Sequence, residues 1–128
     1  MELDTYGTAS DVKELLAVRD SIDELLARRL PEGGAAPGPK AELRDLGEAY
    51  RLVLEVPGVA QEDLEVGVQG RRLVVAGHRE GYGSGDQLFS ERPSGPFQRT
   101  VTLPSEVDAE QATAQLASGL LILHLPKR

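Results

Sequence analysis

The C-terminal quarter of the chain most constrains its fold, because it alternates apolar and polar side chains between proline breakers. Residues 97–103 place Phe97, Val101 and Leu103 on one face, together with Arg99, and polar side chains on the other, as in a half-buried strand. Pro104 ends this strand, since proline has no N–H to donate to a sheet. Residues 112–126 follow the pattern of a β-hairpin with its turn at Ser118-Gly119. The end of the chain is therefore predicted to form antiparallel sheet.

The same alternation begins near residue 41 and predicts further short strands. Residues 52–56 and 64–68 each carry three apolar side chains at every second position, and Leu73 and Val75 continue the pattern. Turn-forming residues separate these strands at regular intervals. Short strands with regular turns favour an all-β fold, an antiparallel β-sandwich.

An amphipathic helix is predicted over residues 10–30, ahead of the β-rich region. Ser10 is a suitable N-cap, and apolar residues recur at three- and four-residue steps. Residues 31–39 form a linker rich in proline and glycine. We therefore divide the chain into an N-terminal arm with its linker, residues 1–40, and a β-domain, residues 41–128. The apolar face of the arm consists of Val12, Leu15, Leu16, Ile22 and Leu26.

This apolar helix face needs a partner, because an exposed apolar stripe is unfavourable in water. Packing onto its own domain would cover the face, and so would pairing in a dimeric coiled coil.

The charge of the chain argues against two classes of partner. The chain carries 21 acidic and 14 basic residues, which gives a net charge of −7. We expect neither nucleic acid nor an anionic membrane to bind, since neither is attracted to an acidic protein. The N-terminus does not have the pattern of a secretory signal, and no apolar run is long enough to cross a bilayer. We expect a soluble, cytoplasmic protein.

The chain offers little material for catalysis. It contains no cysteine, and its histidines are His78 and His124. It has no nucleophile elbow and no H-E-x-x-H zinc motif. The glycine-rich stretch at residues 81–85 does not resemble a phosphate-binding loop, because no Lys-Ser/Thr follows it. We expect no enzyme activity, no metal and no cofactor.

Three short motifs resemble those of the α-crystallin domain of small heat shock proteins of the bacterial type. Ala114–Leu121 is similar to the A-x-x-x-n-G-V-L signature, and Phe97–Pro104 matches the F-x-R-x-[aromatic or aliphatic]-x-L-P strand. Val56–Val59 followed by Glu62–Leu64 is similar to the L-P-G-V…E-D-[IL] turn. The resemblance covers roughly residues 41–126 and implies an immunoglobulin-like sandwich of two sheets.

The resemblance implies an ATP-independent holdase chaperone, which binds partly unfolded proteins through apolar surface and prevents their aggregation. One such surface would be the arm. A second would be a groove between two sheet edges, which in the family receives an I-x-I/V motif from a neighbouring subunit. The expected groove residues are Leu64, Val66, Val68, Ala112, Ala114 and Leu116. The sequence given ends at Arg128 without such a motif, so we expect an open groove and dimers or small oligomers.

The resemblance also implies a homodimer formed by strand exchange. In bacterial and plant relatives the long loop that corresponds to residues 79–96 carries a strand that pairs with the partner subunit. Here residues 88–92 would supply that strand, and residues 43–46 of the other chain would receive it. The alternative is a plain surface loop. The expected interface residues are Leu43, Leu46, Leu88, Phe89, Glu91 and Arg99.

Arg99 lies on the buried side of its predicted strand, where an unpaired cation is costly. A carboxylate or carbonyl acceptors should therefore meet it, unless its guanidinium reaches water at the sheet edge. The resemblance places this arginine at the dimer contact, and Glu91 is a candidate partner.

A protein of another class would share this fold, namely a non-enzymatic adaptor or co-chaperone of the p23/CS type, which binds a specific folded partner. Fold alone does not separate the two, because function depends on sites. The long segment between residues 80 and 95 favours the small heat shock protein, and so does the strand at 97–104.

Overall fold

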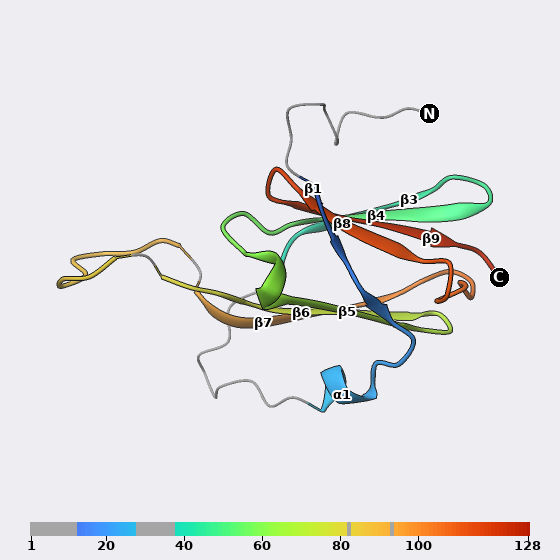
Figure 1. Cartoon of the computed structure of the whole chain (residues 1–128), viewed down its shortest axis with the longest axis horizontal. Coiled ribbons are helices and arrows are strands. Elements are labelled where there is room, and N and C mark those ends of the chain that lie inside the picture. The colour runs from blue at the N-terminus through green and yellow to red at the C-terminus, as the bar shows by residue number, and fades with distance from the viewer. Residues whose placement is uncertain (1–12, 28–37, 82, 93) are drawn as a thin grey trace.

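Two β-sheets packed face to face make up the computed structural model, which describes residues 13–27, 38–81, 83–92 and 94–128 (Figure 1). Sheet A contains, in spatial order, β1 (Lys13–Leu16), β8 (Thr113–Ala117), β9 (Leu120–Pro126), β4 (Ala49–Glu55) and β3 (Ala41–Asp45). Sheet B contains β2 (Val18–Arg19), β5 (Leu64–Gln69), β6 (Arg72–Arg79) and β7 (Gly95–Thr102). One helical turn, α1 (Asp23–Leu26), and one 3₁₀ turn, η1 (Gln61–Asp63), complete the described elements. The all-β sandwich predicted from the sequence is confirmed.

The turn between β8 and β9 has the geometry that the sequence predicts. Ser118 and Gly119 have φ angles of 53° and 77°. Positive φ at both central residues is the requirement of a type I′ turn, whose twist suits two antiparallel strands. Leu116 consequently lies opposite Leu121, and β9 continues into pairing with β4.

The hydrophobic core lies between the sheets and takes alternate residues from both. Ten of its residues have no exposed surface: Leu54, Val56, Val66, Val68, Leu73, Val75, Leu103, Leu121, Leu123 and Leu125. Burial of each such side chain contributes about 1.5–3 kcal/mol before the entropic cost of folding is counted. The strand faces predicted at residues 52–56 and 64–68 are therefore the core faces.

The N-terminal segment differs from the predicted helix. Within the described residues 13–27, only Asp23–Leu26 is helical, while Lys13–Leu16 and Val18–Arg19 are strands. Residues 10–12 and 28–30 lie outside the described part of the chain. An amphipathic helix in a protein gains most of its stability from packing its apolar face against a partner. Here the segment instead pairs its backbone with β8 and β5, whose outer edges would otherwise lack hydrogen-bond partners.

The strand considered for residues 88–92 is not formed in the single chain. The described residues between β6 and β7 leave the sandwich as a long excursion, on the left of Figure 1. A strand needs a neighbour for its backbone groups, and within one chain this segment has no sheet pairing.

A substitution at Gly77 tests the packing between η1, β6 and β7. A Cβ atom at Gly77 would lie 2.6 Å from Cζ of Phe97 and 2.8 Å from the carbonyl oxygen of Asp63. We expect Gly77→Ala to lower the free energy of unfolding by about 1–3 kcal/mol, the usual cost of overpacking. Gly81→Ala is the control, because a Cβ there meets nothing within 4 Å. Equal denaturant midpoints for the two variants would contradict this packing.

Candidate functional site

The six residues predicted to form a groove lie together along one side of the sandwich, where β5 of sheet B and β8 of sheet A are next to the short terminal strands. Three come from β5 and two from β8, and Ala112 directly precedes β8. All belong to the core or pack against it: Leu64 and Leu116 are each 6% exposed, Val66 and Val68 are fully buried, Ala114 is 1% exposed and Ala112 is half-buried. The structure therefore joins both sides of the predicted groove in one apolar cluster.

This groove is not open, which corrects the expectation from the sequence. Strand β1 pairs with β8 and sets Leu16 opposite Ala114, while β2 pairs with β5 and sets Val18 opposite Val66. Leu16 and Val18 are half-buried and pack against the core, whereas Ala17 between them is exposed. The N-terminal segment thus crosses from sheet A to sheet B (Figure 1) with two apolar side chains directed to the core. The gap between the sheet edges is filled because it would otherwise expose core residues to water.

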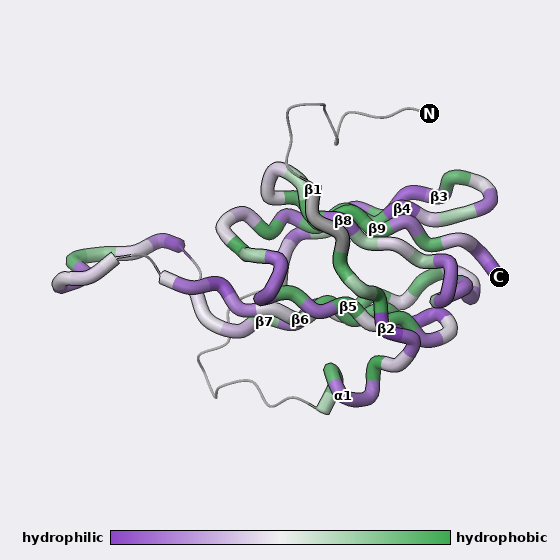
Figure 2. The backbone as a smooth tube through the Cα atoms, in the orientation of Figure 1, coloured by the Kyte–Doolittle hydropathy of each residue, from purple (hydrophilic) through white to green (hydrophobic). Residues whose placement is uncertain are grey.

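The same segment continues onto the outer face of sheet B. Ile22 and Leu25 are 1% and 0% exposed and pack against Val74 and Ala76 of β6. The side-chain amide of Gln98 donates a hydrogen bond of 2.7 Å to the carbonyl of Leu25. Figure 2 shows α1 beneath sheet B, on the side away from sheet A. We call residues 13–26 the strap, because they cover the groove and then this outer patch.

Gly67 of β5 permits the close approach of the strap. A Cβ at this position would lie 2.8 Å from the carbonyl oxygen of Ser21 and about as close to side-chain atoms of Leu25 and Ile22, at 3.0 and 3.1 Å. All three of these nearest atoms belong to the strap. A glycine in mid-strand, which weakens a sheet in general, is here explained by the backbone that lies over it.

The apolar residues expected on one helix face are thus covered by the chain's own domain where the structure describes them. Leu16 packs on the main core, while Ile22 and Leu26 pack with the outer patch. Val12 lies outside the described residues, and so does the side chain of Leu15. Of the alternatives that the sequence left open, packing onto its own domain is confirmed for these three residues.

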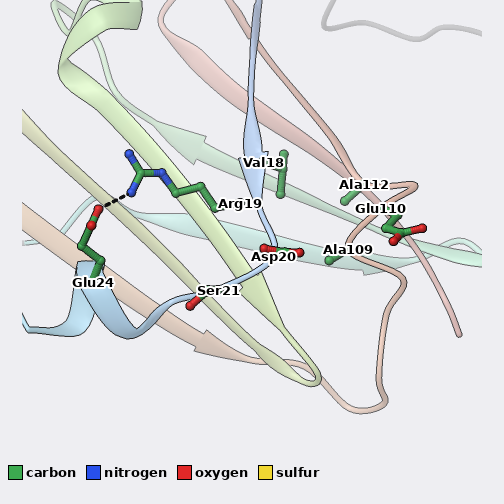
Figure 3. Close-up of a pocket in the computed structure, with 8 residues that line it drawn as sticks. All are labelled: Val18, Arg19, Asp20, Ser21, Glu24, Ala109, Glu110 and Ala112. Atoms are coloured by element: carbon green, nitrogen blue, oxygen red, sulfur yellow. Dashed lines mark hydrogen bonds and ion pairs between the residues drawn. The ribbon is translucent and has the colours of Figure 1, made fainter.

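Arg19 makes one ion pair within the strap and one to sheet B. Its guanidinium lies 2.6 Å from the carboxylate of Glu24 and 2.7 Å from that of Glu65. Figure 3 shows Arg19 and Glu24 on one side of a cleft of about 490 Å³, with Ala109, Glu110 and Ala112 on the other. Because the Arg19 side chain is 44% exposed, each pair contributes only about 0–1 kcal/mol.

The described residues contain no cluster of metal-binding side chains. No group of three or more His, Cys, Asp or Glu residues in them is placed to hold a metal ion. His78 and His124 are both exposed. Within the described residues, no helix has the length and apolar character needed to cross a bilayer.

The predicted dimer residues fall into two separate exposed groups. Leu43 and Leu46, at β3 and just after it, are 36% and 44% exposed, while Leu88 and Phe89 in the excursion are 94% and 83% exposed. These are the exposed large hydrophobic residues of the described chain. The excursion leaves the sandwich on the left of Figure 1, and the β3–β4 hairpin lies on the right. One subunit therefore does not bring its two groups into contact.

Arg99 finds a carbonyl acceptor. Its Nη1 donates a hydrogen bond of 2.9 Å to the carbonyl of Pro39, which is buried two residues before β3 begins. Glu91, the candidate carboxylate, is exposed in the excursion. The requirement for an acceptor is met within the described chain by the linker backbone, an acceptor that the alternation pattern alone does not identify.

An ion pair stabilises the turn that follows β3. The Lys127 ammonium lies 2.9 Å from the carboxylate of Asp45, which also accepts a 2.8 Å hydrogen bond from the N–H of Gly47. The hydrogen bond from Lys127, and after it that from Gly47, lowers the pKa of Asp45. The hydrogen bond to Asp45 raises the pKa of Lys127 in turn.

The sequence of this chain is similar to those of known proteins. The model of the Hsp20/alpha crystallin family matches residues 42–128. Spore protein SP21 of Stigmatella aurantiaca is 39% identical over 100 residues, which are 76% of this chain and 59% of that protein. Heat shock protein 16 of Schizosaccharomyces pombe is 32% identical over 127 residues, which are 95% of this chain and 87% of that protein. The chain thus spans less than two thirds of the first relative's length and most of the second's.

Solved structures share the sandwich. Heat shock protein 16.0 from Schizosaccharomyces pombe superposes with a TM-score of 0.65 at 32% identity and covers 70% of this chain and 86% of that one. A small heat-shock protein from Xylella fastidiosa has a TM-score of 0.62 at 29% identity and covers 70% and 85% of the two chains.

The Asp45–Lys127 pair makes a prediction about titration. The lowered pKa of Asp45 means that its stabilising contribution is present at neutral pH and is lost as the pH falls through that pKa. The raised pKa of Lys127 means that its contribution is lost only as the pH rises through the alkaline range. We expect Lys127→Met to move the NMR titration midpoint of Asp45 upward, toward the ordinary value of 3.8. Lys40→Met, at another exposed lysine, should leave it in place; an unmoved midpoint in Lys127→Met would refute the pairing.

Proposed function

The chain belongs to the Hsp20/alpha crystallin family, and from this premise we propose that it is a small heat shock protein that acts in the cytoplasm as an ATP-independent holdase chaperone. In this role it binds partly unfolded proteins through apolar surface and competes with their self-association by mass action. It carries out no chemical reaction. Its partners are unfolded clients and further copies of itself.

The observation that carries this proposal is the way in which the groove is filled. Leu16 and Val18 enter it as part of an extended backbone that pairs with β8 on one side and β5 on the other. An unfolded protein exposes its backbone groups, and those of its segments that carry apolar side chains at alternate positions offer the same features. Strand addition of this kind gains affinity from main-chain hydrogen bonds and accepts many sequences. Such tolerance suits a chaperone that holds varied clients.

We assign client binding to the groove residues and to the apolar residues of the arm. The groove residues are Leu64, Val66, Val68, Ala112, Ala114 and Leu116. The division into an arm of residues 1–40 and a domain of residues 41–128 is part of this proposal. The match of the family model to residues 42–128 supports it.

The homodimer is proposed to form by exchange of residues 88–92. Strand β3 is the terminal strand of sheet A and offers a backbone edge to a partner. The excursion carries Leu88 and Phe89 almost fully exposed, as a segment awaiting an interface would. Pairing of the excursion with β3 of the other subunit would give hydrogen-bond partners to the backbone of both segments and would cover Leu43 and Leu46.

Arg99 supports this interface through the linker. Its hydrogen bond to Pro39 fixes the backbone just before β3, the strand that receives the partner. Glu91 of an incoming excursion would bring a carboxylate to the same edge. Loss of the Arg99 guanidinium should therefore loosen the dimer as well as the linker.

The holdase role is tested by heat-induced aggregation of a thermolabile client, followed by light scattering without nucleotide. We expect suppression that grows with the concentration of the chain and does not change when ATP is added, because binding is passive. Lysozyme at equal mass controls for crowding. Aggregation that proceeds unchanged at an excess of the chain would overturn the proposal.

The dimer is tested by Phe89→Asp, which places a charge where the proposed interface buries an aromatic ring. We expect the mass measured by light scattering to fall by half, from dimer to monomer, while the circular dichroism spectrum stays the same. Gln87→Asp is the matched control, because Gln87 is an exposed polar residue in the same excursion. A monomeric wild type, or a dimeric Phe89→Asp variant, would count against strand exchange.

A further inference from the structure

The strap covers two apolar surfaces of the domain in succession, and it does so with little secondary structure. Strand β1 has four residues and β2 has two, and α1 is a single turn. By contrast, the central strands β4 and β9 pair over seven residues. A net contribution of about 0.5–1.5 kcal/mol for each backbone hydrogen bond makes the strap the less stable attachment. Segments of this kind open locally at a lower cost than global unfolding.

The side chains of the strap add only modest anchoring. Leu16 and Val18 remain half-buried, and Arg19 reaches Glu24 and Glu65 while nearly half exposed. The firmest contacts are those of Ile22 and Leu25, which are buried on the outer patch. These two contacts lie outside the groove, so the groove portion of the strap is held chiefly by strand pairing and by two partly buried side chains.

We propose that residues 13–26 act as an autoinhibitory strap, which occupies the groove in the isolated subunit and must leave before a client can bind there. The inference rests on the proposed holdase function and adds its regulation. Strap and client exclude each other because both would pair with β8 and β5 and both would insert apolar side chains over Val66 and Ala114. The apparent affinity for a client is then reduced by the fraction of molecules in which the strap is open.

Release of the strap also exposes the outer patch. Val74 and Ala76 are covered by Ile22 and Leu25, so departure of the strap uncovers apolar surface both in the groove between β5 and β8 and on the outer face of β6. The strap itself then presents Ile22, Leu25 and Leu26 to the solvent. One local opening therefore enlarges the client-binding surface on both the domain and the arm.

A reversible cross-link tests the proposal in one protein. Positions 15 and 115 lie directly opposite each other in the β1–β8 register, and the chain has no cysteine of its own. Opposite residues of an antiparallel pair are about 4.5–5.5 Å apart at Cα, within the range that a disulfide spans. The variant Leu15→Cys with Gln115→Cys is compared in its oxidised and reduced states, with a client that does not respond to reductant. Each single-cysteine variant, treated in the same way, is the control.

We expect the oxidised double variant to lose suppression of client aggregation at the concentration at which its reduced form halves it, since the cross-link removes the open state that binds the client. Reduction should restore the activity. The single-cysteine variants should be insensitive to oxidation state.

A second variant releases the strap without touching the groove. Gly67→Val places side-chain atoms where Ser21, Ile22 and Leu25 now lie, and valine suits a strand. We expect this variant to suppress aggregation at about a tenth of the wild-type concentration if the open state is normally near 10% populated. Its strap should also become sensitive to limited proteolysis at Arg19.

The outcomes separate the two proposals. Equal activity of the oxidised and reduced forms, with both active, overturns the strap and leaves the holdase function standing. Greater activity in the oxidised form also overturns it. Inactivity of wild type, reduced double variant and Gly67→Val together overturns the holdase function, and the strap as its regulator fails with it.

Discussion

Backbone hydrogen bonding at the edges of the two sheets is the constraint on which the rest of the structure depends. An open sandwich leaves a row of unpaired N–H and C=O groups along each terminal strand. At one side of the molecule the chain satisfies β8 and β5 with its own residues 13–19. At the far side of sheet A, β3 remains the terminal strand. The edge closed by the strap is where we place clients, and the terminal β3 edge is where we place the second subunit.

The groove holds the strap by contacts that do not depend on a particular sequence. The strap can therefore be part of the native structure and also compete with a client for the groove. Its contacts in the groove are strand pairing and two apolar side chains separated by one residue, Leu16 and Val18. Strand addition accepts many sequences, so another extended apolar segment could make contacts of the same kind. The more specific contacts of the strap lie on the outer face of sheet B, where Gly67 admits the backbone of Ser21. The outer face of sheet B therefore contributes to the affinity of the domain for the strap alone, whereas the groove would contribute to its affinity for the strap and for clients.

Sequence patterns predicted the sandwich but not the strap, for a physical reason. Period-two alternation and the Ser118-Gly119 turn depend on local geometry, and both agree with the structure. Residues 13–26 contain apolar residues spaced for a helix face, yet the available partners were two sheet edges, and tertiary pairing overrode local propensity. A signal was present in β6, where residues 73–76 are apolar without alternation and so call for cover on both faces. The proposed dimer residues would make their contacts with a second subunit, so the packing of one chain neither requires nor identifies them.

We expect the strap to open before the sandwich does, and hydrogen–deuterium exchange of the chain across a temperature series measures this order. The account predicts that peptides covering residues 13–26 lose protection at a lower temperature than peptides from β4 and β9. It also predicts that this temperature coincides with the onset of client binding. Loss of protection in the strap and in β4 and β9 at one common temperature would contradict the account, because the strap would then be an inseparable part of the folded domain.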